Sequence, residues 1–282
     1  VGSEMCIRDS KYASYAYCRT YTGTTCSKER PGSCIAFGVE TRINMRFTLD
    51  THTHTIASGH AYNTIDEMAV YAAGHGVTHL AITDHAPKMP GSAGVLYFSN
   101  MGIIPRKKYG VNIYMGCEVN IMDYDGRIDL SEYGLKGCDV VIASLHIPCI
   151  KPGSIEQNTK ALINAMDNPY VNIIGHPDDS RYPVDYEQLV RAAGEKHVLL
   201  ELNNTSLSPT GPRQGAYDND VTMLKLCKEA GVCISIGSDA HIKESICDFD
   251  RAYKVIEEVG FPKELIVNSN TELYESYIGK RQ

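Results

Sequence analysis

The stretch Arg46-Phe47-Thr48-Leu49-Asp50-Thr51-His52-Thr53-His54 is the starting point for interpreting this sequence. It begins as a short strand and ends in two histidines that are two positions apart. In an extended segment this spacing places both imidazoles on one face, where they can chelate one metal ion. A lone His-x-His pair is common by chance, so its meaning depends on what the rest of the chain supplies.

From residue 45 onward, short apolar runs alternate with amphipathic helical stretches, which indicates βα units around a parallel sheet or barrel. Strands are predicted near 47–51, 78–83, 111–116, 139–144, 171–175, 198–202 and 232–237. The first helix is expected to begin at a capping box formed by Thr64 and Glu67, and further helices near 155–167, 185–194, 219–230 and 249–259. The sequence therefore predicts an α/β fold, a seven-stranded (β/α) barrel.

The segment 86–108 has three prolines, three glycines and no clean period, which favours a loop or lid. Residues 1–44 show neither a strand nor a helix period, and their first ten residues resemble translated adaptor sequence. We expect 1–44 to be a non-native or disordered extension, with Met45 as the biological start; a genuine small appendage is the alternative. Residues 45–282 are expected to form one catalytic domain.

Metal-ligand side chains recur at the carboxyl ends of the predicted strands, where the functional groups of such barrels lie. Seven of the ten histidines of the chain belong to this group, together with one glutamate and one aspartate: His52, His54, His60, His85, Glu118, His146, His176, Asp239 and His241. The other three histidines, at 75, 79 and 197, are expected to be structural, because they lie at the opposite end of the barrel. Asp50 and Asp84 either orient ligating imidazoles or cap loops.

Composition limits the function classes. The 282 residues are 43% hydrophobic with a net charge of -7, and lysines and arginines are scattered, so we expect a small substrate and no stable nucleic-acid binding. No apolar run approaches the roughly 20 residues that span a bilayer, and the N-terminus lacks a secretion pattern. The protein is predicted to be cytoplasmic without membrane contact. Its ten cysteines form no CxxC pair and are expected to be reduced thiols.

Several motifs together resemble the PHP family of metal-dependent phosphoesterases. They are Asp50-Thr51-His52-Thr53-His54-Thr55, Ile82-Thr83-Asp84-His85, Glu118, His146, Gly175-His176-Pro177 and Gly237-Ser238-Asp239-Ala240-His241. The stretches Ala57-Ser58-x-His60-Ala61-Tyr62 and Glu201-Leu202-Asn203-Asn204-Thr205-Ser206 are similar to the YcdX-type phosphatases of that family. The resemblance spans nearly all of 45–282.

The resemblance implies a distorted seven-stranded (β/α)7 barrel with three divalent transition-metal ions. The implied ligands are His52, His54, Glu118 and Asp239 for the first ion, His60, His85 and His241 for the second, and Glu118, His146 and His176 for the third. Imidazole-rich coordination favours zinc, with iron or manganese as alternatives, over calcium or magnesium.

The expected reaction is hydrolysis of a phosphate monoester by a metal-activated water. Glu118, Asp239 and Arg213 are the predicted catalytic residues. Arg213 and Arg106 are candidates for binding the substrate phosphate, since the guanidinium fork matches phosphoryl oxygens. Ser238 is expected to shape the backbone and to have no role as nucleophile.

Four alternatives stay open. The first is a phosphodiesterase or exonuclease, as in the PHP domains of bacterial DNA polymerases. The second is a non-catalytic metal-binding regulatory protein on the same barrel. A metal-dependent amidohydrolase is less favoured, because those enzymes usually bridge their metals through a lysine, whereas Glu118 fills the bridging role in this chain. A histidinol-phosphate phosphatase is a narrower form of the main prediction. The sequence does not indicate the oligomeric state.

Overall fold

The computed structural model describes residues 46–281, so the predicted extension at 1–44 lies outside the described residues. Seven parallel strands form one sheet, in the order β1-β2-β4-β5-β6-β7-β8. Their bounds are Leu49–Asp50 (β1), His79–His85 (β2), Val111–Asn120 (β4), Val140–Ser144 (β5), Ile173–Ile174 (β6), Leu199–Asn203 (β7) and Ile234–Gly237 (β8). The short strand β3 (Lys107–Lys108) pairs with β4 in the antiparallel direction. These strands confirm the seven predicted from the sequence.

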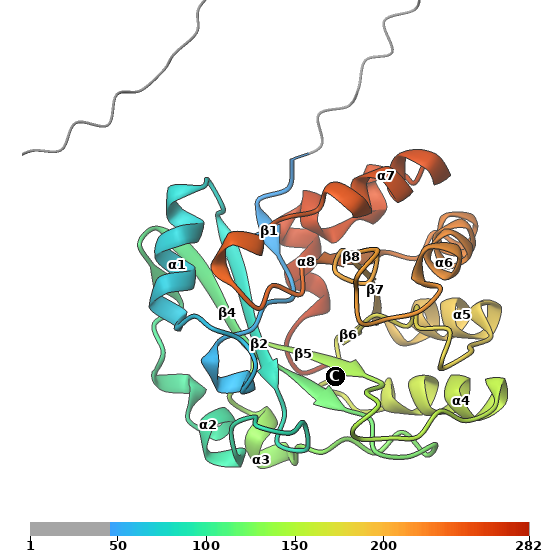
Figure 1. Ribbon diagram of the computed structural model, residues 1–282, viewed down its shortest axis with the longest axis horizontal. Coiled ribbons are helices and arrows are strands. Elements are labelled where there is room, and N and C mark those ends of the chain that lie inside the picture. The colour runs from blue at the N-terminus through green and yellow to red at the C-terminus, as the bar shows by residue number, and fades with distance from the viewer. Residues whose placement is uncertain (1–45, 282) are drawn as a thin grey trace, which may run out of the picture. The chain divides into compact units, whose positions relative to one another are not determined.

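The sheet curls into a nearly closed barrel (Figure 1). Beyond β1 and β8 a parallel bridge joins Thr53 to Ala240. Two backbone hydrogen bonds support it: His54 N donates to Ala240 O at 2.8 Å, and Asp239 N donates to His52 O at 2.9 Å. The seam between the first and last strands therefore closes at their carboxyl ends, among the predicted metal ligands.

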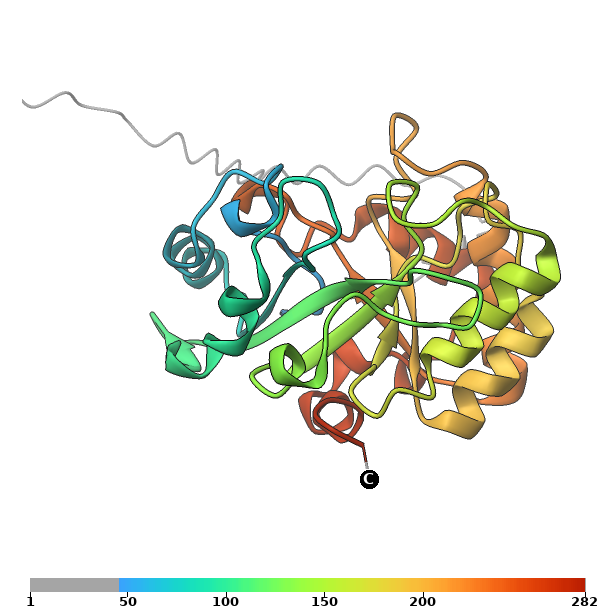
Figure 2. The ribbon, with the colours of Figure 1, turned by 90° about the horizontal axis from the view of Figure 1, so that it is seen from below.

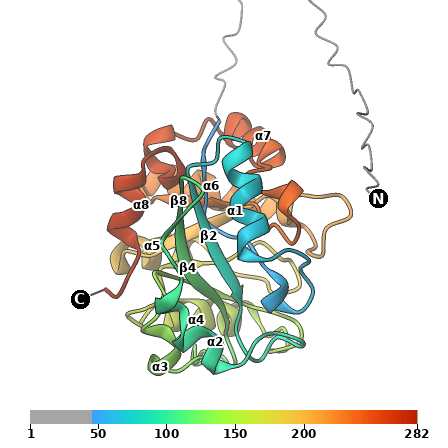
Figure 3. The same ribbon diagram turned by 90° about the vertical axis from the view of Figure 1, so that its left-hand side faces the viewer.

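Helices surround the strands. The longer ones are α1 (Ile65–Gly74), α4 (Ile155–Ala165), α5 (Tyr186–Lys196), α6 (Ala216–Ala230) and α7 (Asp250–Val259), and the shorter ones are α2 (Val95–Ser99), α3 (Glu132–Leu135) and α8 (Thr271–Tyr277). Helices α4, α5 and α6 lie side by side along one flank (Figure 2), and α1 lies against β2 and β4 (Figure 3). The capping box that starts α1 is present, as Thr64 and Glu67 predicted. Among the described residues, no helix is long and apolar enough to cross a bilayer.

Helix α8 blocks the amino-terminal end of the barrel. Its Tyr274 is fully buried and packs with residues at the starts of the strands, including Leu49, Ala81, Val140 and Leu199. Because this end is filled by side chains, the opposite end, where the strands finish, is the one left for chemistry.

The segment 86–108 differs from its prediction as a loop or lid. It contains α2, a 3-10 turn at Met101–Ile103 and β3. Phe98 and Met101 from this segment are buried in the main core. It is anchored by this packing, although a five-residue helix is too short to give a periodic signal.

Candidate metal centre

The structure brings all nine predicted metal ligands to the carboxyl end of the barrel. His85 ends β2 and Glu118 lies within β4, while the other seven lie on the loops that follow β1, β5, β6 and β8. Strand β4 extends beyond its predicted end at 116, because residues from Cys117 to Asn120 pair with β5. The candidate ligand set thus comes from six strands that are widely separated in sequence.

Glu118 lies at the centre of the group and is fully buried. Its Oε2 atom is 2.7 Å from His85 Nδ1 and 3.4 Å from His52 Nε2. Its Oε1 atom is 2.8 Å from His176 Nε2 and 3.2 Å from His146 Nε2. One carboxylate therefore faces imidazoles on both sides, the arrangement expected of a group that bridges two ions.

Asp239 joins the two histidines of the opening motif across the barrel seam. The Nε2 atoms of His52 and His54 are 3.0 Å apart, and Asp239 Oδ1 is 3.2 Å from His54 Nε2 and 3.8 Å from His52 Nε2. Asp239 has φ of 56°, a left-handed conformation that aspartate tolerates better than most residues. This backbone turn places both Asp239 and His241 at the site.

His60 and His241 complete the cluster on its outer side. The ring centroid of His60 lies 5.0 Å from that of His85 and 4.7 Å from that of His241. His60 follows the 3-10 turn Ile56–Ser58, whose end at Gly59 has φ of 82°. The loop after β1 therefore folds back over its own strand end, as the sequence predicted.

The donor geometry fits metal ions. Three groups have ligand atoms that all lie within 4.8 Å of one another: His52 with His54 and Asp239, His54 with His85 and His241, and His85 with Glu118 and His146. Glu118 Oε2, His85 Nδ1 and His146 Nε2 are buried, and the close contacts that they make within the cluster are not hydrogen bonds. Buried polar atoms without partners are costly, so these three atoms are accounted for best as donors to ions.

The electrostatics of the cluster favour the protonation states that metal ligands need at Glu118 and His54 and oppose them at His52. Burial lowers the pKa of His52, but the carboxylates of Glu201, Glu118 and Asp239 raise it well above the ordinary histidine value. Burial raises the pKa of Glu118, but His146, His85 and His52 together bring it well below its usual range. Burial lowers the pKa of His54 well below the ordinary histidine value, and neighbouring His85 lowers it further. Ionised carboxylates and neutral imidazoles are the ligating forms.

Buried acceptors outside the set of nine orient several of the candidate ligands. Glu201, within β7, has its Oε1 atom 2.7 Å from His52 Nδ1, and its Oε2 atom accepts a hydrogen bond from His176 N at 2.8 Å. His146 Nδ1 lies 2.7 Å from Asn120 Oδ1. His54 Nδ1 lies 3.0 Å from Ser58 Oγ. These contacts fix ring orientation and tautomer, and the sequence reasoning assigned no role to Glu201, Asn120 or Ser58.

Asp84 and Asp50, left open by the sequence, have different roles. Asp84 accepts hydrogen bonds from Ser58 Oγ at 2.7 Å and Thr55 N at 2.7 Å, so it orients His54 through Ser58. Asp50 accepts from the backbone N–H groups of Ser238 and Cys247 and so holds loops. Ser238 Oγ accepts from Ala240 N, in keeping with its predicted backbone role.

Arg213, on the loop between β7 and α6, reaches the centre. Its NH2 donates to Asp239 Oδ2 at 3.1 Å, and its NH1 donates to Ser206 Oγ at 3.1 Å and Asn203 Oδ1 at 3.3 Å. Its side chain is only 10% exposed. The guanidinium is therefore held beside a candidate metal ligand.

Arg106 lies elsewhere. Its guanidinium donates to the carbonyl oxygens of Met101, Ile104 and Gly137 and pairs with Asp139, near the amino ends of β4 and β5. The structure thus gives Arg106 a structural role and does not bring it to the cluster, although it was the second candidate for binding phosphate.

The histidines expected to be structural also lie apart from the cluster. The ring of His75 stacks on Tyr71, and the ring of His197 stacks on Tyr277. His79 Nε2 is 2.8 Å from Asn112 Nδ2. The six cysteines in the described part of the chain are free thiols, as expected.

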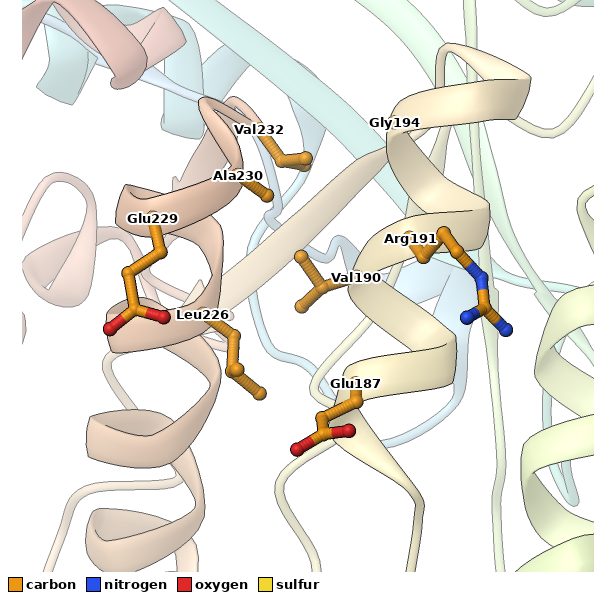
Figure 4. Close-up of a pocket in the computed structure, with 8 residues that line it drawn as sticks. All are labelled: Glu187, Val190, Arg191, Gly194, Leu226, Glu229, Ala230 and Val232. Atoms are coloured by element: carbon orange, nitrogen blue, oxygen red, sulfur yellow. The ribbon is translucent and has the colours of Figure 1, made fainter.

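A groove on the surface between two helices is lined by none of the nine candidate ligands. It lies between α5 and α6, has a volume of about 470 Å³ and is lined by Val190, Leu226, Ala230 and Val232 with Glu187, Arg191 and Glu229 at its edges (Figure 4).

The sequence matches a known protein family and several curated relatives. Residues 50–260 match the family described as the PHP domain. A probable phosphatase of Clostridium novyi is 47% identical over 234 residues, covering 83% of this chain and 95% of the relative. A probable phosphatase of Acetivibrio thermocellus is 45% identical over 238 residues, covering 84% of this chain and 98% of the relative.

A solved structure shares the fold at low sequence identity. It is the histidinol phosphate phosphatase of Lactococcus lactis in complex with zinc, L-histidinol and phosphate. The TM-score is 0.55 at 20% identity, and the match covers 76% of this chain and 94% of the other.

Proposed function

The chain belongs to the PHP-domain family, and from that membership we propose that it is a metal-dependent phosphatase that cleaves phosphate monoesters of small molecules. The relatives named probable phosphatase support this, since the match spans nearly their whole length. The net charge of -7 also favours a small phosphorylated substrate over a long polyanion.

The observation that carries the proposal is the position of Glu118 between two sets of imidazoles, with His85 Nδ1 and His176 Nε2 on different oxygens of one buried carboxylate. We assign three divalent ions to the nine ligands. Zinc is the first choice, because imidazole dominates the donors and the L. lactis protein of the same fold was solved with zinc. When bound, such ions lower the pKa of a coordinated water and offset the charge of phosphoryl oxygens.

The chain's own residues prepare this site. Glu201 holds His52 and the backbone of His176, so two ligands on different strands keep a fixed relation. Arg213 uses its NH1 and NH2 groups on Asn203, Ser206 and Asp239, and its Nε–H has no hydrogen-bond partner among the described residues. We propose that this Nε–H group donates a hydrogen bond to a phosphoryl oxygen of the substrate.

The test combines elemental analysis of gently purified protein with a panel of phosphate monoesters and diesters. We expect three transition-metal ions per chain and hydrolysis confined to monoesters. His146→Ala should lower both metal content and activity, whereas the control His75→Ala should change neither. One ion or fewer per chain, with no gain on adding metal, would contradict the trinuclear site. Hydrolysis of diesters alone would point to the phosphodiesterase alternative, and no hydrolysis at all to a regulatory protein.

A further inference from the structure

The loop that carries Arg213 is held by a second loop, residues 178–181, which follows β6 and the ligand His176. Arg181 NH2 donates to Pro212 O at 2.8 Å. Ser180 N donates to Gln214 O at 2.7 Å, and Gln214 N donates to Asp179 Oδ1 at 3.3 Å. Three consecutive residues therefore fix the backbone on both sides of Arg213.

An ion pair within the 178–181 loop supports these contacts with the backbone around Arg213. Arg181 Nε lies 3.0 Å from Asp179 Oδ1 and 2.9 Å from Asp179 Oδ2. Asp179 is 8% exposed, and the side chain of Arg181 is 33% exposed. The hydrogen bonds from Arg181 offset the effect of burial and lower the pKa of Asp179. An ion pair contributes most to stability when arginine and carboxylate form a forked contact and one partner is buried, as in this pair.

The two loops also fit closely. Gly215 has φ of 64°, and a Cβ added there would lie 2.1 Å from Ser180 Oγ. Asn219, in the first turns of α6, donates to Asp178 O at 2.6 Å and to Ser180 Oγ at 3.0 Å. The segment from 212 to 219 is therefore attached to the loop after β6 along its length, although the two segments are about 30 to 40 residues apart in sequence.

We propose that Asp179 and Arg181 are positioning residues that hold the guanidinium of Arg213 at the metal centre. This rests on the proposed function of Arg213 as the group that binds phosphoryl oxygens. Arginine loses much conformational freedom when it is fixed, so a pre-positioned guanidinium saves part of the entropic cost of binding substrate. We call these contacts between the two loops the clamp. Because His176 lies just before the 178–181 loop, the clamp also links the loop of Arg213 to a candidate metal ligand.

Arg181 could instead contact substrate directly, and the contacts argue against that role. Its Nε and NH2 groups are taken up by Asp179 and Pro212. Arg181 therefore acts through the loop of Arg213, and removing it should matter only while Arg213 is present.

A double-mutant cycle separates these roles. We expect Arg181→Ala to lower kcat/KM on a phosphomonoester about tenfold in the wild-type background and to have almost no effect in an Arg213→Ala background. Asp179→Asn should behave like Arg181→Ala, and Arg181→Lys should restore part of the loss. The matched control is Arg191→Ala, an exposed arginine on α5 (Figure 4), which should leave kcat/KM unchanged. Equal losses in both backgrounds would overturn the proposal and make Arg181 an independent substrate contact.

A second measurement does not depend on activity. Trypsin cuts after arginine where the backbone can open, so the rate of cleavage after Arg213, scaled to cleavage after the exposed Arg127, reports how firmly the loop is held. We expect this ratio to rise at least several-fold in Arg181→Ala and Asp179→Asn, with metal content and circular dichroism unchanged. An unchanged ratio would overturn the clamp. If the wild type hydrolyses no phosphomonoester, the proposed function fails, and the cleavage ratio still decides whether the clamp exists.

Discussion

At the scale of single residues, Glu201 orients the ring of His52 through its contact with Nδ1, although Glu201 is not itself a predicted metal ligand. We expect Glu201→Gln to weaken zinc binding by about tenfold to a hundredfold, the usual cost of losing a carboxylate behind a ligating imidazole. The amide would place an N–H group toward either His52 Nδ1 or His176 N, both of which now face a carboxylate oxygen. Competition with a chromogenic chelator measures the affinity, with the exposed Glu195→Gln as control. Equal affinities for Glu201→Gln and wild type would remove Glu201 from the site.

Arg213 gives a prediction of a different kind, because it should affect rate without affecting metal. We expect Arg213→Ala to keep its metal and lose roughly a hundredfold in kcat/KM, the magnitude typical of removing one preorganised charged donor. Arg213→Lys should recover only part of this, since a point charge cannot reproduce the fork. Arg106→Ala is the matched control: it should lower the melting temperature but leave kcat/KM of the folded protein unchanged. Near-normal activity of Arg213→Ala would exclude it from substrate binding.

The residues that sequence reasoning found and missed differ in physical terms. The nine candidate ligands could be proposed from the sequence because rare side chains recur where apolar runs end. Glu201 and Asn120 lie inside strands, where an inward polar residue looks like ordinary alternation. The contact of Glu201 with His52 spans 149 residues. Such pairs become visible only when the closed barrel brings β7 near the end of β1, with Gly237 of β8 between Glu201 and His52.

At the scale of elements, the loop after β1 depends on a close approach between two glycines. A Cβ on Gly59 would lie 2.3 Å from the carbonyl oxygen of Gly91, whereas a Cβ on Gly91 would meet Gly59 Cα at an ordinary 3.6 Å. Both have positive φ, of 82° and 87°. We expect Gly59→Ala to displace the loop and reduce the metal that His60 helps to bind.

Gly91→Ala is the control for that prediction, because it shares the backbone strain of about 1–2 kcal/mol without the clash. Metal content and melting temperature should both fall further in Gly59→Ala than in Gly91→Ala. Equal effects would mean that backbone strain alone matters and that the contact between the two loops does not position His60.

Element boundaries were predictable where packing and pattern agree. The long helices α4, α5 and α7 begin and end within a few residues of their predicted limits. Strands β1 and β6 are two residues each and are shorter than predicted at both ends. Helices α2, α3 and α8 were missed, because four to seven residues give too little periodicity.

At the scale of the whole molecule, the barrel is completed by two features that no local pattern indicates. Tyr274 of α8 fills the amino end, and the seam between β1 and β8 closes through one bridge, Thr53 with Ala240. The sequence predicted the number of strands and the face that carries the candidate ligands. It did not indicate how the barrel is blocked at one end and closed at its seam, since both features join segments that are far apart in the sequence.

The metal centre should therefore also stabilise the fold at this seam. His52 and His54 lie on one side and Asp239 and His241 on the other, so ions bound by both sides would cross-link the first and last strands. Chelation should lower the melting temperature, because ions bind the folded state far better than the unfolded chain. The loss should be uneven across the barrel: hydrogen exchange at the seam amides His54 N and Asp239 N should accelerate more than at Cys117 N, which lies in β4 between two paired strands. The measurement is residue-resolved hydrogen exchange of the metal-loaded and chelated protein. A uniform change at all three amides would mean that the ions stabilise the barrel as a whole and do not cross-link its seam.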